Sequence, residues 1–198
     1  MTSDREDRTT PLGVAVLLAA GGGSRYAGRT HKLLARIDDR EVWRWALDAA
    51  VSAGFAHVIV VTGAVELDVD TTARVVHNPR WAEGQATSLH CAIDAARALD
   101  ATHLTVGLAD QPFVGAAAWR AVGSADPRCR IALAVYADRP GPHPVRLAAD
   151  TWSLVPETGD EGARELLRAH PDWCCRIDCV GSPDDVDTVE DLDRWLRP

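Results

Sequence analysis

The sequence has no apolar run close to the roughly 20 residues that a membrane-spanning helix requires. It is also poor in basic residues, because 21 lysines and arginines stand against 29 aspartates and glutamates, for a formal net charge of -8. A nucleic-acid-binding protein would be expected to present a basic face. These absences argue against membrane and nucleic-acid partners, although a single pocket can still bind a small anion.

A secretory signal is also absent from the beginning of the sequence. Residues 1–11 are polar and of mixed charge, without a basic segment followed by an apolar one. We expect a disordered N-terminal segment there, followed by one domain over residues 12–198 in a cytoplasmic protein. That length is enough to bury a hydrophobic core without additional cross-links.

The cysteines contain no C-x-x-C pair. Their number is odd, since the sequence has Cys91, Cys129, Cys174, Cys175 and Cys179. The last three of them lie close together in the sequence. A thiolate metal site is conceivable at the cluster, but its spacing does not match a zinc pair and its neighbours indicate a strand. We therefore expect buried structural thiols.

Apolar segments of strand length alternate with segments of helical spacing. Strands are predicted over residues 14–20, 57–62, 73–77, 103–109, 131–137 and 173–180, and helices over 41–53, 85–99, 115–122, 161–169 and 189–196. This alternation predicts an α/β protein with a doubly wound, mostly parallel sheet between two layers of helices. The proline- and glycine-rich stretch 139–144 is interpreted as an active-site loop.

A glycine-rich turn follows the first predicted strand. It comprises Leu18, Ala19, Ala20, Gly21, Gly22, Gly23 and Ser24. Glycines allow backbone N–H groups to approach a ligand and to point at phosphate oxygens, and ligands of open α/β sheets bind at this edge. The turn matches neither the Walker-type P-loop nor the G-x-G-x-x-G dinucleotide pattern. A plain tight turn is the alternative, but Arg25 and Lys32 add two cations suited to a triphosphate.

At these residues the sequence resembles the MobA-like nucleotidyltransferases, and within them the molybdenum cofactor cytidylyltransferase branch. The resemblance rests on Leu18-Ala19-Ala20-Gly21, on Arg25 and on Lys32-Leu33-Leu34. The chain departs from the pattern at Tyr26-Ala27-Gly28, which is one residue longer than usual. The resemblance implies a Rossmann-like nucleotidyltransferase fold, a turn that binds the nucleotide, and catalytic roles for Arg25 and Lys32.

The stretch from Asn78 to Leu89 predicts a turn that enters a helix, with Thr87 or Ser88 as a cap or as a ligand contact. It also fits the N-P-x-W-x-x-G-x-x-x-S-L pattern of the resembled family. The resemblance implies that Asn78, Gly84 and Ser88 bind the nucleotide.

Two acidic segments are candidates for a cation site. Asp110 follows a predicted strand, and residues 184–192 contain five acids in nine positions. Each segment could equally cap the following helix. The resemblance implies that Asp110 and Asp187 bind Mg²⁺, with Asp185 as a weaker candidate. It also implies a catalytic role for Asp110.

Two further elements could contact a second substrate. His143 lies between two prolines, and Gly159, Asp160 and Arg164 lie at a predicted helix start. The first could be incidental and the second a simple helix N-terminus. The resemblance implies that these four residues bind the acceptor.

The activity implied is transfer of CMP from CTP to molybdopterin with release of pyrophosphate. The resemblance implies cytidine as the base, because Leu18-Ala19-Ala20-Gly21 stands where members that use guanosine have Leu-Ala-Gly-Gly. Two alternatives stay open: another phosphorylated acceptor, such as a sugar phosphate or phospholactate, and a non-catalytic maturation protein that binds a molybdoenzyme client.

Overall fold

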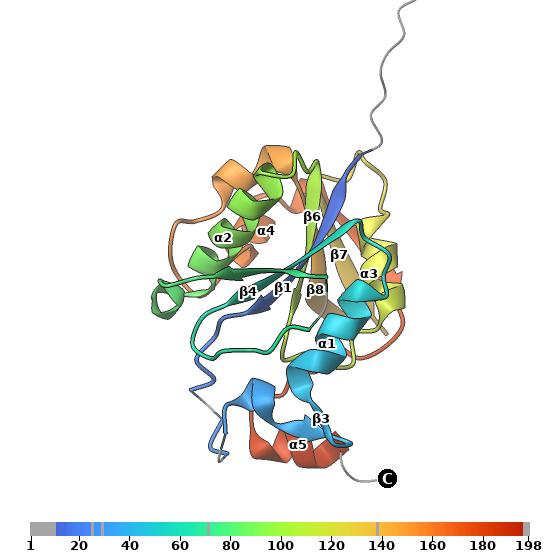
Figure 1. Cartoon of the computed structure of the whole chain (residues 1–198). Helices are drawn as coiled ribbons and strands as arrows, with labels where there is room; N and C mark the ends of the chain where they lie inside the picture. The colour runs from blue at the N-terminus through green and yellow to red at the C-terminus, as the bar shows by residue number, and fades with distance from the viewer. Residues whose placement is uncertain (1–10, 25, 29, 71, 138, 196–198) are drawn as a thin grey trace, which may run out of the picture.

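The computed structural model describes residues 11–24, 26–28, 30–70, 72–137 and 139–195. Its centre is a seven-stranded sheet with the order β5-β4-β1-β6-β8-β7-β9 (Figure 1). The strands are β1 (Gly13–Ala19), β4 (His57–Thr62), β5 (Arg74–His77), β6 (His103–Leu108), β7 (Ile131–Tyr136), β8 (Arg139–Ala148) and β9 (Cys174–Cys179). All neighbours pair in parallel except β8, which runs antiparallel to β6 and β7. The predicted mostly parallel sheet is confirmed.

Strand β1 lies inside the sheet, between β4 and β6, and is buried on both faces. Its side chains alternate, so Val14, Val16 and Leu18 enter one core cluster while Ala15 and Leu17 enter the other. An uninterrupted apolar run is required at this position, because water reaches neither face.

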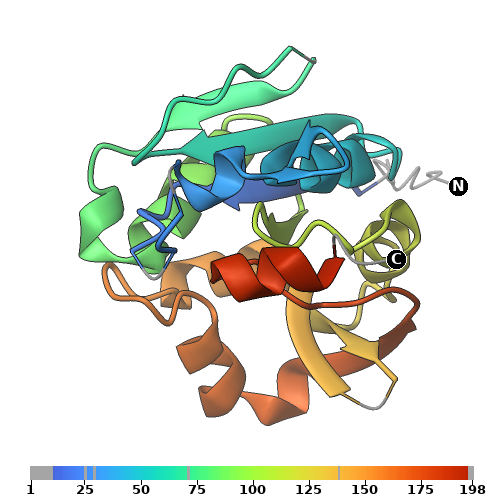
Figure 2. The ribbon, with the colours of Figure 1, turned by 90° about the horizontal axis from the view of Figure 1, so that it is seen from below.

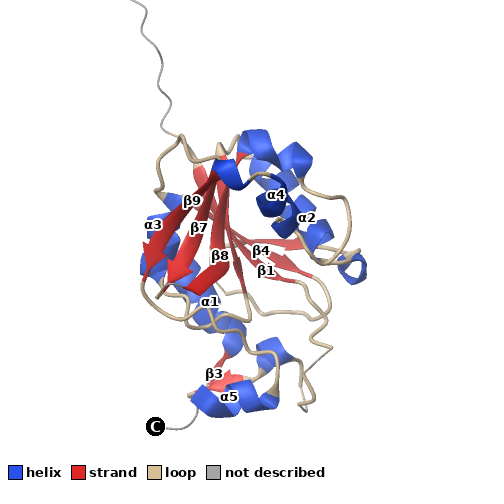
Figure 3. Cartoon of the chain, turned by 180° about the vertical axis from the view of Figure 1, so that it is seen from behind, coloured by secondary structure: helices blue, strands red, loops and turns tan. Residues whose placement is uncertain are grey.

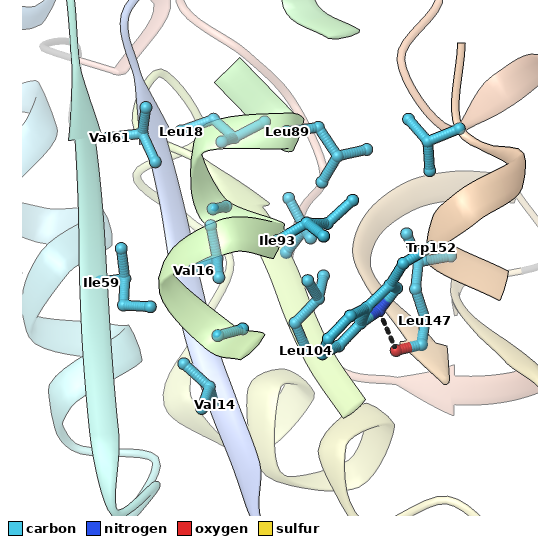
Figure 4. Packing of buried hydrophobic residues seen from close by; sticks show 14 of the residues in the cluster. Val14, Val16, Leu18, Ile59, Val61, Leu89, Ile93, Leu104, Leu147 and Trp152 are labelled. Carbon is cyan, nitrogen blue, oxygen red and sulfur yellow. Dashed lines mark hydrogen bonds between the residues drawn. The ribbon is translucent and has the colours of Figure 1, made fainter. Parts of the chain in front are cut away.

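Helices cover both faces of the sheet, as the three-layer prediction requires (Figures 1 and 3). Helices α2 (Gln85–Arg97) and α4 (Arg164–Ala169) lie over one face, and α1 (Val42–Val51) and α3 (Ala116–Gly123) over the other. Figure 4 shows Leu89 and Ile93 of α2 facing the valines of β1. Short 3-10 helices occur at η1 (Lys32–Leu34), η2 (Trp81–Glu83), η3 (Ala149–Leu154) and η4 (Pro171–Trp173).

Most predicted elements differ from the observed ones by one to three residues at their ends. The largest shift is at α4, which begins at Arg164 rather than at residue 161. Gly159 and Gly162 before it have φ angles of +104° and +52°, in the left-handed region. The chain therefore turns sharply over this stretch before the helix can start.

The interpretation of residues 139–144 as a loop is wrong, because they belong to the ten-residue strand β8. Proline normally disfavours strand pairing because it lacks an N–H donor. Here a register shift between Leu133 and Val135 of β7 interrupts the pairing, and β8 pairs with β7 on both sides of it.

The expectation of buried thiols is wrong for Cys129 and Cys175, which form a disulfide with a Cα–Cα distance of 5.8 Å. Cys129 precedes β7, and Cys175 pairs with Ala132 at the start of β7, so the parallel β7–β9 contact brings the two sulfurs together. The cysteines at positions 91, 174 and 179 are free thiols, and they are half-buried rather than fully buried.

A small extension lies below the sheet in Figure 1, and Figure 2 views it from beneath. It combines the two-stranded sheet of β2 (Arg36–Ile37) and β3 (Arg40–Glu41) with helix α5 (Val189–Trp195). A third hydrophobic cluster joins these parts through Ala35, Ile37, Val42, Val186 and Leu192. The C-terminal segment is thereby held against the segment that follows the glycine turn.

Residues 1–10 of the predicted N-terminal segment lie outside the described residues. Within the part of the chain that the structure describes, no helix combines the length and apolar character needed to cross a membrane.

We expect the Cys129–Cys175 disulfide to make the unfolding free energy of the protein depend on its redox state. Because the cross-link closes a span of 46 residues, its loss is expected to lower the unfolding free energy of the oxidised protein by about 2–4 kcal/mol. Urea denaturation of wild type and of C129S/C175S, each with and without dithiothreitol, measures this difference. Dithiothreitol should destabilise wild type and the control C179S equally and leave the double variant unchanged. A double variant as stable as oxidised wild type would contradict the prediction.

Candidate active site

A cavity of about 650 Å³ opens at the carboxyl ends of β1 and β6. Its lining brings together most of the predicted site residues: the whole turn from Leu18 to Ser24, with Lys32, Gly84, Ser88, Asp110, Asp160, Arg164 and Asp187. Asn78, His143 and Gly159 are not part of this lining. Arg25, which the sequence places in the site, lies outside the described residues.

The glycine turn presents backbone rather than side chains to the cavity. Gly21 and Gly22 are exposed, and a Cβ at Gly21 would meet no atom within 4 Å. Gly23 has a φ of +61°, which the turn requires and which glycine adopts without strain. The open backbone of this turn is suited to contacts with phosphate oxygens.

His31 holds the turn in place, a role that the sequence did not reveal. Its Nδ1 accepts a hydrogen bond from the N–H of Leu33 at 3.3 Å, so its Nε2 is the donor to the carbonyl of Gly21 at 2.9 Å. Burial lowers the pKa of the imidazole and favours this neutral form. The ring therefore links the glycine turn to the start of η1.

The central electrostatic feature is a lysine between two carboxylates. Lys32 Nζ donates to Asp110 Oδ2 at 2.6 Å and to Asp187 Oδ1 at 2.8 Å, and the side chains of all three residues are at most 17% exposed. Burial disfavours the ammonium charge, but the charges and hydrogen bonds of the two aspartates outweigh it and raise the pKa of Lys32. Asp185 lies beside them, and loss of surrounding water and the charges of Asp187 and Asp110 raise its pKa.

The loop that carries Asp187 is tied directly to the loop that carries Asp110. The N–H of Val186 donates to the carbonyl of Asp110 at 2.9 Å, and Gln111 Nε2 donates to the carbonyl of Pro183 at 2.8 Å. Val186 itself is fully buried in the third cluster. No role was predicted for Gln111 from the sequence, because its function is a tertiary contact.

The residues of this cluster fit a small divalent cation. Asp110 Oδ1 is buried and has no hydrogen-bond partner among the described residues. No group of three His, Cys, Asp or Glu side chains in the described part of the chain could by itself enclose a metal. Mg²⁺ is commonly held by one or two carboxylates together with substrate phosphates and water, so Asp110 and Asp187 meet its requirements.

Asn78 organises the start of α2 from below the cavity surface. It is 1% exposed, and its Nδ2 donates to Thr87 Oγ1 and to Ser88 Oγ, both at 2.9 Å. Its Oδ1 accepts from the N–H of Arg80. Asn78 therefore positions Ser88, which does line the cavity, and makes no contact with that space itself.

Gly84 and Gly159 place two distant segments in contact. The carbonyl of Gly159 accepts from the N–H of Ala86, and the N–H of Gly159 donates to the carbonyl of Glu83, both at 2.9 Å. A Cβ at Gly84 would lie 2.3–2.8 Å from backbone atoms of Gly159. This close approach is what carries Asp160 and Arg164 to the cavity.

His143 occupies a separate small cavity of about 20 Å³, which also contacts Leu18 and Arg164. The side chain is almost fully buried, and its Nδ1 has no partner among the described residues. Burial and the nearby charge of Arg164 lower the pKa of His143 to about 3. A space of this size holds about one water molecule, so in this conformation His143 lies behind the cavity wall.

Trp81 is a cavity residue that fits the sequence pattern but was not assigned to the site. Its indole is 36% exposed and lies against the glycine turn, because a Cβ at Gly22 would approach Trp81 to within 2.9 Å. The partial exposure of the Trp81 ring in a polar cavity wall indicates a ligand contact, since such a ring offers a flat apolar surface to a ligand.

An exposed glycine turn, a lysine and paired carboxylates at the carboxyl edge of a mostly parallel sheet define an α/β protein that binds phosphorylated nucleotides. The chain belongs to the family described as MobA-like NTP transferase domain, whose model matches residues 15–173. The family resemblance noted in the sequence is thus confirmed, and the chain is a member of a nucleotidyltransferase family.

Solved structures resemble the chain over nearly its whole length. Rv0371c from Mycobacterium tuberculosis H37Rv is 31% identical, with a TM-score of 0.74 over 95% of this chain and 99% of that one. Its complex with manganese matches at 29% identity and a TM-score of 0.74, over 93% and 98% of the two chains. A nucleotidyl transferase from Methanothermobacter thermautotroptrophicus is 23% identical, with a TM-score of 0.79 over 93% and 98%, and supports the fold alone.

Curated relatives share only part of their length with the chain. The bifunctional protein GlmU of Granulibacter bethesdensis is 30% identical over 138 residues, which are 69% of this chain and 30% of that protein. The chain spans less than a third of the length of the GlmU proteins that it matches.

The Gly84–Gly159 contact predicts that G84A is destabilising. Gly84 has a φ of +111°, and the added methyl group would overlap the backbone of Gly159, so we expect a loss of about 2 kcal/mol in unfolding free energy. The matched control is G115A, where a Cβ would meet no atom within 4 Å and the expected change is under about 1 kcal/mol. Denaturant titration of both variants measures the difference, and equal stabilities would contradict the close contact.

Burial of His143 predicts a specific dependence of stability on pH. Its folded-state pKa of about 3 lies below the ordinary value of 6.5, so the unfolded chain binds the extra proton between these values. The unfolding free energy should fall as pH drops below 6.5, by up to about 1.4 kcal/mol per pH unit from this group, and the loss should stop near pH 3. H143Q should show a shallower slope than wild type from pH 7 to 4. Parallel slopes would mean that burial does not lower the pKa of His143 in the folded protein.

Proposed function

We propose that the protein transfers CMP from CTP to the terminal phosphate of molybdopterin and releases pyrophosphate. The observation that carries the proposal is the convergence of the glycine turn, Lys32 and the Asp110–Asp187 pair in one cavity of about 650 Å³. Nucleotidyl transfer needs positioning and charge neutralisation more than a protein nucleophile.

The glycine turn and Lys32 would bind the triphosphate. Backbone N–H groups from Gly21 to Gly23 can donate to phosphate oxygens, and the Lys32 ammonium can neutralise charge that develops on the departing pyrophosphate. Arg25 would add a second cation there. Cytidine is the proposed base because of the Leu18-Ala19-Ala20-Gly21 form of the turn.

Asp110 and Asp187 would hold a divalent cation, for which Mg²⁺ is the proposed ion. When bound, it would supply Lewis-acid polarisation of the α-phosphate and charge neutralisation. The fit of the two carboxylates and the manganese complex of the related Mycobacterium tuberculosis protein support this assignment.

The acceptor would enter beside Asp160 and Arg164, which line the cavity. Its terminal phosphate oxygen forms a bond to the α-phosphorus of CTP as the bond to the β-phosphate oxygen breaks. Arg164 is exposed and positively charged, so it can attract and orient that phosphate. Gly159 supports this segment through its contact with Gly84, and His143 lies one layer behind it.

A different phosphorylated acceptor is the second candidate. The similarity to GlmU proteins supports a sugar phosphate in this role. Two of these relatives are 34% and 38% identical to the chain over the matched segments. The cavity has room for a nucleotide and part of a second substrate of either kind.

Pyrophosphate release tests both candidates directly. CTP, GTP, ATP and UTP are each incubated with Mg²⁺ and with either molybdopterin or a panel of sugar phosphates. The proposal expects release with CTP and molybdopterin only. Release with sugar phosphates alone would mean that the acceptor is a sugar phosphate. The melting temperature is measured with each nucleotide in parallel, and a melting temperature that none of them changes would favour a non-catalytic binding protein that serves a molybdoenzyme client.

Asp110 provides the sharpest test of the metal assignment. D110N removes one negative charge at nearly constant volume, so we expect the fold to persist and Mg²⁺-dependent pyrophosphate release to be lost. The matched control is D94N, a carboxylate that is 73% exposed on α2 and should leave turnover unchanged. Circular dichroism checks the fold, and near-normal turnover of D110N would remove Asp110 from the site.

A further inference from the structure

We propose that Lys32 is an internal cation that occupies the metal position of the nucleotide-free protein, so that metal binding requires the arrival of a nucleotide. This inference rests on the proposed function and concerns the order in which its components bind. It assigns Lys32 a second role, besides contact with the phosphates.

The geometry places the ammonium in the space that the metal needs. Lys32 Nζ contacts Asp110 Oδ2 at 2.6 Å and Asp187 Oδ1 at 2.8 Å. A Mg²⁺ ion bound to the same oxygens would lie about 2.0–2.1 Å from each of them. The ammonium and the ion would then compete for the same two oxygens, and their like charges repel at short separation. Lys32 must therefore leave Asp110 Oδ2 and Asp187 Oδ1 before the ion can bind these two oxygens.

Lys32 has a destination beside the glycine turn. Its Cγ would lie 3.3 Å from a Cβ at Gly23, so its stem passes directly beside the glycine turn. Rotation of the side chain away from the carboxylates would carry the ammonium toward phosphates held by that turn. A bound triphosphate would give the released ammonium an anionic partner beside that turn. The nucleotide thus supplies the charge that makes the exchange favourable.

The choice of amino acid is consistent with such an exchange. Lys32 is the only lysine of the sequence, and the other 20 of its 21 basic residues are arginines. An ammonium is a compact charge on a flexible stem, whereas a guanidinium forms a rigid two-pronged contact with a carboxylate. A lysine can exchange partners more readily than an arginine in the same place.

Binding of Mn²⁺ in the absence of nucleotide tests the competition without any turnover. Free Mn²⁺ is measured by electron paramagnetic resonance for wild type, for K32M and for R97M, which removes an exposed charge from α2. We expect K32M to bind Mn²⁺ at least about tenfold more tightly than wild type, and R97M to bind like wild type. Equal affinities of K32M and wild type would overturn the inference.

The single lysine also allows a test that needs no variant. Wild-type protein labelled with ¹³C at lysine Cε has one such side-chain signal. We expect Mg²⁺ alone to leave this signal in place and Mg²⁺ with a non-hydrolysable CTP analogue to shift it. A shift with Mg²⁺ alone that equals the shift with both ligands would overturn the coupling.

The two proposals fail in different ways. If pyrophosphate release is absent but K32M binds Mn²⁺ tightly, the reaction is wrong and the cation exchange stands. If CTP-dependent release occurs while Mn²⁺ binds wild type and K32M equally, the exchange is wrong and the reaction stands. If neither wild type nor K32M binds Mn²⁺, both the inference and the assignment of Asp110 and Asp187 as metal ligands are overturned.

Discussion

The ion pairs that Lys32 forms with Asp110 and Asp187 join three segments far apart in the sequence. They unite the end of β6, the short helix after the glycine turn and the C-terminal extension. Their strength depends on a low exposure, because water would screen them. That low exposure depends in turn on the third hydrophobic cluster, where Val186 and Leu192 pack the extension in place. The low exposure of the charged side chains, and with it the strength of their ion pairs, therefore depends on this hydrophobic packing.

This arrangement also explains how an acidic chain can bind a more acidic ligand. The net charge of -8 is an average over the whole surface. At the cavity the exposed amides of the glycine turn, Lys32 and Arg164 supply local positive potential. Part of the acidic excess, at Asp110 and Asp187, is placed where it would hold a cation. The same carboxylates that would repel a lone triphosphate would thus help to bind one that carries a metal.

Sequence patterns located the parallel sheet and most of the cavity lining, because both depend on local features. An uninterrupted apolar run marks β1, and glycines mark the turn after it. The errors arose where pairing partners decide the outcome. Residues 139–144 looked like a loop because of their prolines, and Cys129 and Cys175 looked unrelated at a separation of 46 residues. Asn78 and His143 carried the right polarity for ligand contacts, but only packing could show that they lie behind the cavity surface.

The sequence by itself determined most of the strands and helices, the glycine turn and the family to which the chain belongs, since hydrophobic periodicity and short motifs act within a few residues. The tertiary structure decided which distant groups meet. It brought Gly159 against Gly84, His31 against Gly21 and Lys32 between two aspartates. Gly159 and Gly84 meet through the arrangement of distant segments, and Asp187 reaches Lys32 because Val186 and Leu192 pack in the third cluster, which no local pattern encodes. Distances of a few ångströms between charges then determine which cation the carboxylates hold.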